Sequence, residues 1–228
     1  TKMKKPNKLL IFDASSLISL AMNGLDPLLP KLKKEFDGKF ILPYAVKKEV
    51  IDKPSKIKKY ELEALKMKKI LGDTLELPSS IGIDKKKAEN KTKDILTLTN
   101  KLFKARGENI EAIHRGEAEC LALSILARKE NIETVIALDE RTTRMLIEKP
   151  KNLKKLFRKK LHTNVGMKKR PSVLKNIRFI RSSELAYVAY KKGLVELENH
   201  VLEALLYAVK SKGCAISTKE IKKIKKLA

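Results

Sequence analysis

The stretch KLLIFDASSLISLAM, residues 8–22, decides the fold of this chain. It opens with the short apolar run KLLIF, which is the pattern of a strand covered on both faces in a parallel sheet. Asp13 ends the run, and Ser15 and Ser16 follow as residues that can cap a helix. A buried strand that passes at once into a helix is typical of an α/β fold.

The same pattern returns along the chain. Residues 134–138 (TVIAL) form another apolar run that ends in an aspartate, Asp139. Residues 40–42 and 176–181 predict two further strands, and residues 73–91 predict a connection. Helices are expected at 43–52, 57–71, 91–106, 116–129 and 140–148. This alternation predicts a three-layer α/β/α fold with a mainly parallel central sheet.

The chain of 228 residues is long enough for one domain with a helical appendage. We expect one α/β domain at 1–182, with a basic insertion at about 149–176, and a C-terminal helical extension at 183–228. Within that extension, Ser217 and Glu220 have the spacing of a capping box.

Charge is the most pronounced feature of the composition. Lys and Arg number 52 against 27 Asp and Glu, a formal net charge of +25. Such a surplus favours an acidic partner, above all nucleic acid. Part of the lysine content fits a protein from a hot environment, since the chain is rich in Lys, Glu and Ile and has no Gln. No transmembrane or signal segment is expected, so we predict a cytoplasmic protein without a membrane partner.

Residues 149–183 hold 13 Lys and Arg and no Asp or Glu. This region should bind the phosphate backbone of RNA without reading its sequence. A solvated lysine face is the alternative. Phe157 and Phe179 lie within it and are expected in the core, with base stacking as the alternative. The predicted RNA-binding residues are Lys154, Lys155, Arg158, Lys159, Lys160, Lys168, Lys169 and Arg170.

Two cysteines, Cys120 and Cys214, cannot build a disulfide framework, and neither has a Cys or His at metal-binding spacing. Cys120 lies in an apolar helical run and is expected to be buried and inert.

Acidic residues stand where ligands bind in open α/β sheets, beyond the carboxyl ends of the strands. Asp13 and Asp139 each follow an apolar strand, although a lone aspartate there is also a common turn or cap residue. Glu49 shares a helix face with the apolar Val46 and Val50, which predicts an inward-facing carboxylate. A salt bridge to one of the many lysines is the alternative for Glu49.

Glu117 and Glu119 lie in the first turn of the apolar helix 116–129, where the helix dipole alone favours carboxylates. Helical geometry does not choose between them. Carboxylates gathered with Asp13 and Asp139 would repel one another without cations, which predicts Mg²⁺ or Mn²⁺ at the site.

Four segments in this order, IFDASSLI, LPYAVKKEVID, GEAECLALS and IALDERTTR, resemble the PIN-domain family, including VapC-type toxin ribonucleases and their archaeal relatives. The resemblance covers about residues 8–147. It implies that four carboxylates are both catalytic and metal-ligating, with Ser15 as a supporting residue and Glu119 as a substitute or helper. The implied ligands are Asp13, Glu49, Glu117 and Asp139. No second aspartate follows Asp139; Glu140 stands there instead.

The resemblance implies a metal-dependent endoribonuclease that hydrolyses RNA phosphodiester bonds, as a toxin or as an RNA-processing factor. Its implied partners are RNA, an antitoxin protein or the ribosome, and a second copy of the chain. One alternative is a non-catalytic RNA- or ribosome-binding module on the same scaffold. Another is a DNA-binding regulator that uses the helices at 196–226 as a helix-turn-helix.

Overall fold

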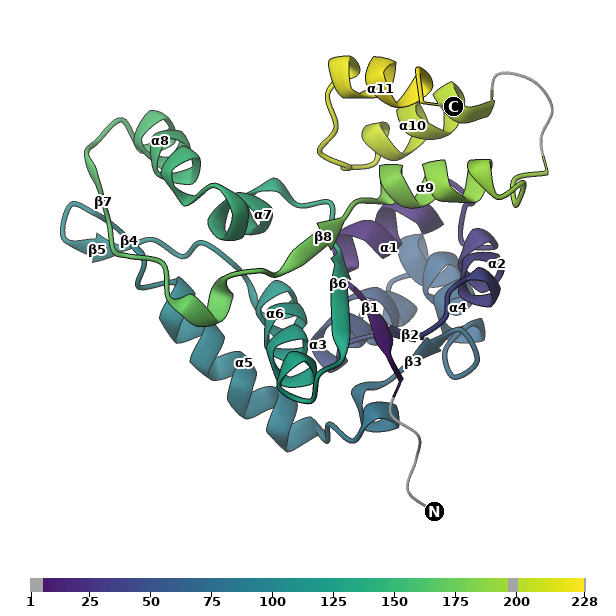
Figure 1. Ribbon diagram of the computed structural model, residues 1–228, viewed down its shortest axis with the longest axis horizontal. Coiled ribbons are helices and arrows are strands. Elements are labelled where there is room, and N and C mark those ends of the chain that lie inside the picture. The colour runs from purple at the N-terminus through teal and green to yellow at the C-terminus, as the bar shows by residue number, and fades with distance from the viewer. Residues whose placement is uncertain (1–5, 197–200, 228) are drawn as a thin grey trace.

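The computed structural model describes residues 6–196 and 201–227 and has an α/β architecture (Figure 1). Its central sheet has five parallel strands in the order β3-β2-β1-β6-β8. The strands are β1 (Lys8–Phe12), β2 (Lys39–Ile41), β3 (Leu75–Glu76), β6 (Glu133–Ala137) and β8 (Arg178–Ile180). The predicted α/β class and parallel sheet are confirmed.

The middle strands β1 and β6 are apolar because helices cover both faces of the sheet. Leu9 to Phe12 are all buried, and the register pairs Phe12 with Ala137. The backbone N–H of Asp13 continues the ladder by donating to the carbonyl of Ala137 at 2.9 Å. Strands β1 and β6 therefore end at the same edge of the sheet.

Helices form the two outer layers. On one face α6 packs against β1 and β6 with α5 beside it, and on the other face α1 lies against α9 and α10 (Figure 1). The α-helices are α1 (Ala14–Ala21), α2 (Leu28–Glu35), α3 (Tyr44–Lys47), α4 (Glu61–Lys69), α5 (Lys85–Thr99), α6 (Arg115–Lys129), α7 (Arg141–Glu148), α8 (Pro150–Leu161), α9 (Ser182–Lys191), α10 (Val201–Ser211) and α11 (Thr218–Lys225). A π-helical turn, Lys48–Asp52, continues α3.

Several predicted boundaries were wrong. The helix expected at 57–71 starts at Glu61, after two short 3-10 turns. The helix expected at 91–106 is α5, which begins at Lys85 because Asp84 caps it and accepts a hydrogen bond from the Lys87 N–H at 2.7 Å. The region 73–91, expected to be mostly a connection, therefore contains β3 and the start of α5.

The basic region folds into regular structure. It forms α8 and the strand β7 (Val165–Met167), which pairs with β4 (Phe103–Ala105) in a small antiparallel sheet completed by β5 (Glu108–Asn109). Phe157 is buried and packs edge-on against Phe103, with 5.3 Å between the ring centroids. Phe179 is half-buried against the core. The prediction that both rings pack in the core is confirmed.

The C-terminal helices join the same hydrophobic core as the sheet. Leu185 on α9 and Leu206 on α10 belong to it, and the hydroxyl of Ser19 donates to the carbonyl of Val209 at 3.1 Å. The predicted Ser217–Glu220 capping box is confirmed at the start of α11. The first of the helices expected at 196–226 would begin near residues 197–200, which lie outside the described residues.

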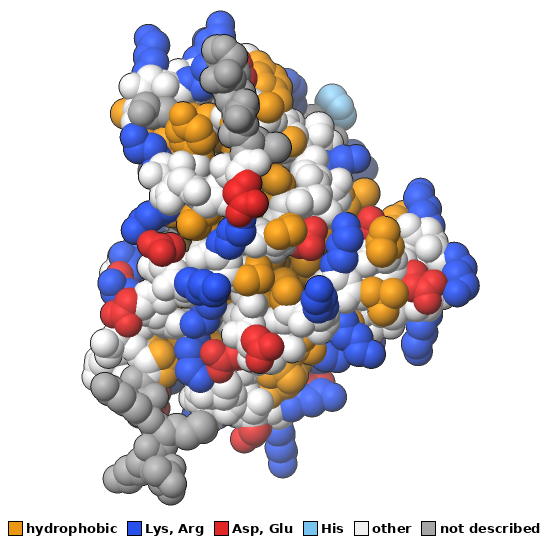
Figure 2. Space-filling model, turned by 90° about the vertical axis from the view of Figure 1, so that its right-hand side faces the viewer, with side chains coloured by type: hydrophobic (Ala, Val, Ile, Leu, Met, Phe, Trp, Pro, Cys, Tyr) orange, Lys and Arg blue, Asp and Glu red, His pale blue; other side chains and the backbone are white. Residues whose placement is uncertain are grey.

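Charges are mixed on the face that carries α2 and α4, where Asp and Glu side chains lie among Lys and Arg (Figure 2). Lys31 and Glu35 of α2 make ion pairs with Glu196 and Lys192. Both cysteines are free and buried, as predicted for Cys120. None of the described helices combines the length and the apolar character that crossing a membrane requires.

Candidate active site

Three carboxylates follow three neighbouring strands of the sheet. Asp13 comes directly after β1, and Glu140 comes three residues after the end of β6. Glu49 lies on the π-helical turn that follows β2 through α3. Because β2, β1 and β6 are adjacent and parallel, spaced by about 4.8 Å, their carboxyl ends bring these acidic groups to one edge.

Asp13 lies at the centre of this edge and is only 4% exposed. Its Oδ2 accepts hydrogen bonds from the N–H of Ser15 at 2.9 Å and from the Ser15 hydroxyl at 2.5 Å, so Asp13 caps α1. Burial raises the pKa of Asp13, the bonds from Ser15 oppose that rise, and the charge of Glu140 adds to it. The Ser15 hydroxyl also accepts from the N–H of Asp139, which fixes its orientation. Ser15 thus has the supporting position predicted for it.

Glu49 is a half-buried carboxylate on the same side as the buried Val46 and Val50, as predicted. Within the described part of the chain it has no hydrogen-bond or ion-pair partner. Burial raises its pKa, and the charge of Asp13 raises it further. A Cβ at Gly116 would lie 3.0 Å from Oε1 and 3.2 Å from Oε2 of Glu49. Glycine at position 116 therefore leaves room for this carboxylate against α6.

Glu117, on the first turn of α6, faces the same edge. Its Oε2 accepts a hydrogen bond from the N–H of His114 at 2.5 Å, which stabilises the start of the helix. Burial, with the charges of Asp13 and Glu140, raises the pKa of Glu117 to about 7 despite that bond. Neighbouring carboxylates that raise each other's pKa lie close together without enough positive charge between them.

Asp139 does not join this group, contrary to the geometry we expected from sequence. It is fully buried, and its two oxygens accept from the N–H and the hydroxyl of Ser182 at 2.7 and 2.6 Å, so it caps α9. Its charge raises the pKa of Cys214, whose thiol is also buried. Glu140, the next residue, contributes the charge that Asp13 and Glu117 experience. Successive residues leaving a strand point to opposite sides, which separates the two.

Glu119 also has a structural role. Its oxygens accept from the N–H groups of Tyr44 at 3.0 Å and Ala45 at 2.7 Å, and so hold the start of α3. Because α3 leads into the turn that carries Glu49, Glu119 positions that carboxylate from behind. The structure therefore gives Glu119 a role in holding α3, while its prediction as a substitute or helper for Glu117 stays a prediction.

Cys120 marks the point on which these charges converge. Its thiol donates to the carbonyl of Phe12, the last residue of β1, at 3.7 Å. Burial raises the pKa of Cys120, and the charges of four carboxylates raise it further: Asp13, Glu119, Glu117 and Glu49. Carboxylates from three separate segments thus act on one buried thiol at the end of the central strand.

The chemistry of this donor set fits a hard divalent cation, because Mg²⁺ and Mn²⁺ prefer carboxylate oxygens. Among the described residues, no three Asp, Glu, His or Cys side chains are close enough to form a complete metal cage. Mg²⁺ does not require such a cage, since it keeps several waters and takes one or two carboxylates together with substrate phosphates. A cation here would take one or two of the carboxylates Asp13, Glu49, Glu117 and Glu140, with waters as its other ligands.

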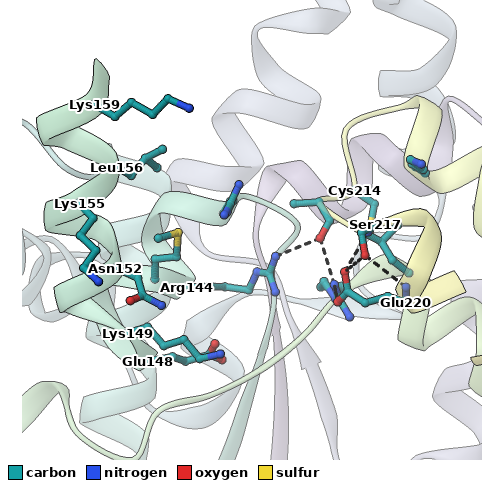
Figure 3. A pocket seen from close by; sticks show the side chains of 16 residues that line it. Arg144, Glu148, Lys149, Asn152, Lys155, Leu156, Lys159, Cys214, Ser217 and Glu220 are labelled. Carbon is teal, nitrogen blue, oxygen red and sulfur yellow. Dashed lines mark hydrogen bonds and ion pairs between the residues drawn. The ribbon is translucent and has the colours of Figure 1, made fainter. Parts of the chain in front are cut away.

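A basic cavity of about 890 Å³ lies next to Glu140, between α7 and α8 on one side and α10 and α11 on the other (Figure 3). Its lining has seven Lys and Arg residues against two Glu. Two of the eight predicted RNA-binding residues, Lys155 and Lys159, line it, and the other six do not. Sequence reasoning missed the cations from other segments: Arg141, Arg144, Lys149, Arg181 and Lys210.

A second cavity, of about 690 Å³, lies on the β2 side of the edge and contains Glu119. Two of its cations are already paired, Lys47 with Asp52 and Arg115 with Glu89, each at 2.6 Å. It therefore has fewer free positive charges for a ligand than the cavity next to Glu140.

Comparison with protein-family models, with curated proteins and with solved structures finds no match to this chain.

Proposed function

We propose that this protein is a metal-dependent endoribonuclease of the PIN type. The observation that carries the proposal is the convergence of Asp13, Glu49 and Glu140, which follow three adjacent parallel strands, with Glu117 facing them from α6. A protein that only binds RNA has no use for a group of acidic side chains beside its phosphate-binding surface, because they repel the ligand.

In this mechanism each residue either would bind the cation or orients a residue that would. Asp13 is the central ligand, and Ser15 keeps its carboxylate oriented by two hydrogen bonds. Glu49 and Glu140 complete the acidic group from either side of the sheet edge. Glu117, with its pKa raised to about 7, would have to be deprotonated to hold a cation, which would make metal binding stronger as the pH rises. A bound cation would supply a hydroxide from water and stabilise charge on the phosphate.

The proposed substrate is RNA because the net charge of +25 and the basic cavity next to Glu140 both favour a polyanion. A toxin with an antitoxin partner and an RNA-processing factor remain equal candidates for the biological role. Both use the same chemistry at the sheet edge.

A non-catalytic RNA- or ribosome-binding module is the second candidate. The observation in its favour is that Asp13, Glu117 and Glu140 each cap a helix, which gives them a structural role without any metal. Helix capping does not explain Glu49, however, because its carboxylate caps no helix.

The test is an RNA cleavage assay with Mg²⁺, with Mn²⁺ and with EDTA, on wild type and on Asp13→Asn, Glu49→Gln and Glu140→Gln. The proposal expects cleavage that requires metal and is lost in these variants while the fold is kept, as judged by circular dichroism. Cleavage that persists in EDTA, or RNA binding without cleavage in either metal, would contradict it and favour the binding module.

A further inference from the structure

The basic cavity next to Glu140 gathers seven Lys and Arg side chains in one hollow, and only some of them have a partner. The side chains of Arg141, Lys149, Lys155 and Lys159 have no hydrogen-bond or ion-pair partner within the described part of the chain. Of the two carboxylates in the lining, Glu220 is engaged by Arg181 at 2.9 Å and by Ser217. Burial alone would raise the pKa of Glu220, but those contacts hold it at about 2.

Arg144 connects this cavity to the acidic edge. Its Nε donates to the carbonyl of Glu140 at 3.4 Å, and its Nη2 donates to the carbonyl of Ala215 at 3.3 Å across the cavity (Figure 3). The side chain of Arg144 thus contacts both the backbone of Glu140 and the opposite wall of the cavity. Glu140 therefore lies beside the cavity, immediately before Arg141, which lines it.

We propose that this cavity binds the phosphates of a single strand of RNA on the Glu140 side of the cleavage site. This deepens the proposed function, since it assigns a subsite and a strand type to the same substrate. Lys155 and Lys159 lie one helical turn apart on α8, and Figure 3 shows them along the same wall, where they can contact successive phosphates. The side chains of Met145, Leu156 and Ile216 line the cavity between the cations and offer apolar contact to bases.

The dimensions favour a single strand over a duplex. A volume of about 890 Å³ is that of a pocket that encloses a compact ligand, roughly 300–1,000 Å³, and so accommodates a few nucleotides. No Phe, Tyr or Trp lines the cavity in the described part of the structure, so binding relies on phosphate contacts and not on base stacking. We therefore expect affinity that depends weakly on base sequence and strongly on salt.

The test compares two pairs of substitutions on the same helix. Lys155→Ala with Lys159→Ala removes two cations from the cavity. Lys154→Ala with Arg158→Ala removes two cations at the same spacing that do not line it. Both double variants lower the net charge by the same amount, so only the position of the lost charge differs. Thermal unfolding checks that both remain folded.

Binding is measured by fluorescence anisotropy in EDTA, with a labelled single-stranded RNA of about 12 nucleotides, a length within the usual range of site sizes. The cavity pair should weaken binding by about 10- to 30-fold and lower the slope of log Kd against log salt by about 1.4, since each contact to a single strand contributes about 0.7. The control pair should change affinity by less than about 3-fold. Equal losses in both pairs would overturn the proposal.

A hairpin duplex of the same length serves as competitor. It should compete at least about 10-fold less well than the single strand, and equal competition would contradict the assignment of strand type. Since every measurement is made in EDTA, binding is scored without cleavage. The binding measurement therefore tests the cavity even if the protein proves not to be a nuclease. In turn, a cavity pair that behaves like its control says nothing against cleavage by wild type.

Discussion

The sheet edge and the cavity beside it have opposite charges, and both are left without counter-charges. At the edge, Asp13, Glu49 and Glu117 raise one another's pKa or are raised by burial. In the cavity, four of the seven cations have no partner among the described residues.

The face that carries α2 shows what neutralisation looks like in this protein. There Lys31 pairs with Glu196 at 2.5 Å and Lys192 with Glu35 at 3.1 Å. Exposed pairs of this kind contribute little to stability, about 0–1 kcal/mol. Unpaired like charges cost free energy, and ligands of opposite charge would relieve that cost: the proposed cation at the edge and the proposed phosphates in the cavity.

Loss of the central carboxylate, Asp13, should have the largest effect on activity. Asp13→Asn should lower the rate of RNA cleavage by about 10³-fold or more, because the proposed cation loses its central ligand and several kcal/mol of transition-state stabilisation. Single-turnover kinetics with saturating RNA measure this effect. Retention of more than about a tenth of the wild-type rate would show that Asp13 is only a helix cap.

Substitutions at the neighbouring residues Asp139 and Glu140 should have different effects, one on stability and the other on cleavage. Glu140→Gln should reduce cleavage by about 30- to 100-fold with little change in stability, since a neutral side chain can still accept from the Thr143 N–H. Asp139→Asn should lower the free energy of unfolding by about 2–3 kcal/mol, because it weakens two buried bonds to Ser182. Urea unfolding measures the stability of each variant, and cleavage rates below the melting temperature measure its activity. Loss of cleavage in Asp139→Asn but not in Glu140→Gln would identify Asp139 as the ligand.

Substitution in the cavity should affect binding of RNA more than chemistry. Lys155→Ala with Lys159→Ala should raise KM by about 10-fold and leave kcat within about 3-fold of wild type, because these residues contact phosphates away from the reacting bond. Steady-state cleavage of a short RNA gives both constants. A large loss of kcat with unchanged KM would mean that the cavity takes part in the chemical step.

The smallest effect concerns pH. Glu117 has a folded pKa of about 7, above the ordinary 4.5, so between these values the folded state binds more protons than the unfolded state. Stability of the metal-free protein should therefore fall as pH rises from about 5 to 8, by about 1–2 kcal/mol once partial solvent screening is allowed for. Thermal unfolding in EDTA measures it, and Glu117→Gln should flatten the dependence. A stability that rises with pH in this window would contradict the acidic grouping.

The sequence predicts those parts of the fold that depend on local pattern. The continuous apolar runs at 8–12 and 134–138 predict buried parallel strands, and β1 and β6 lie within one residue of those positions. Asp13 and Glu49 are also predictable, because a strand end and a helix face determine their positions. Glu117 could be recognised only together with Glu119, since both flank the apolar face of α6.

Features that depend on distant partners could not be predicted. Asp139 leaves the acidic group because Ser182, 43 residues further along the chain, takes both of its oxygens. The presence of Glu140 immediately afterwards was the one signal in the sequence. The cavity was hidden in the same way, because its walls come from α7 and α8 and from the segment between α10 and α11.

Binding of Mn²⁺, followed by electron paramagnetic resonance in the absence of RNA, tests the central claim most directly. The account predicts saturable binding to wild type and to Asp139→Asn, and its loss in Asp13→Asn and in Glu49→Gln. Wild-type affinity in Asp13→Asn, or loss of binding in Asp139→Asn alone while that variant remains folded, would contradict it.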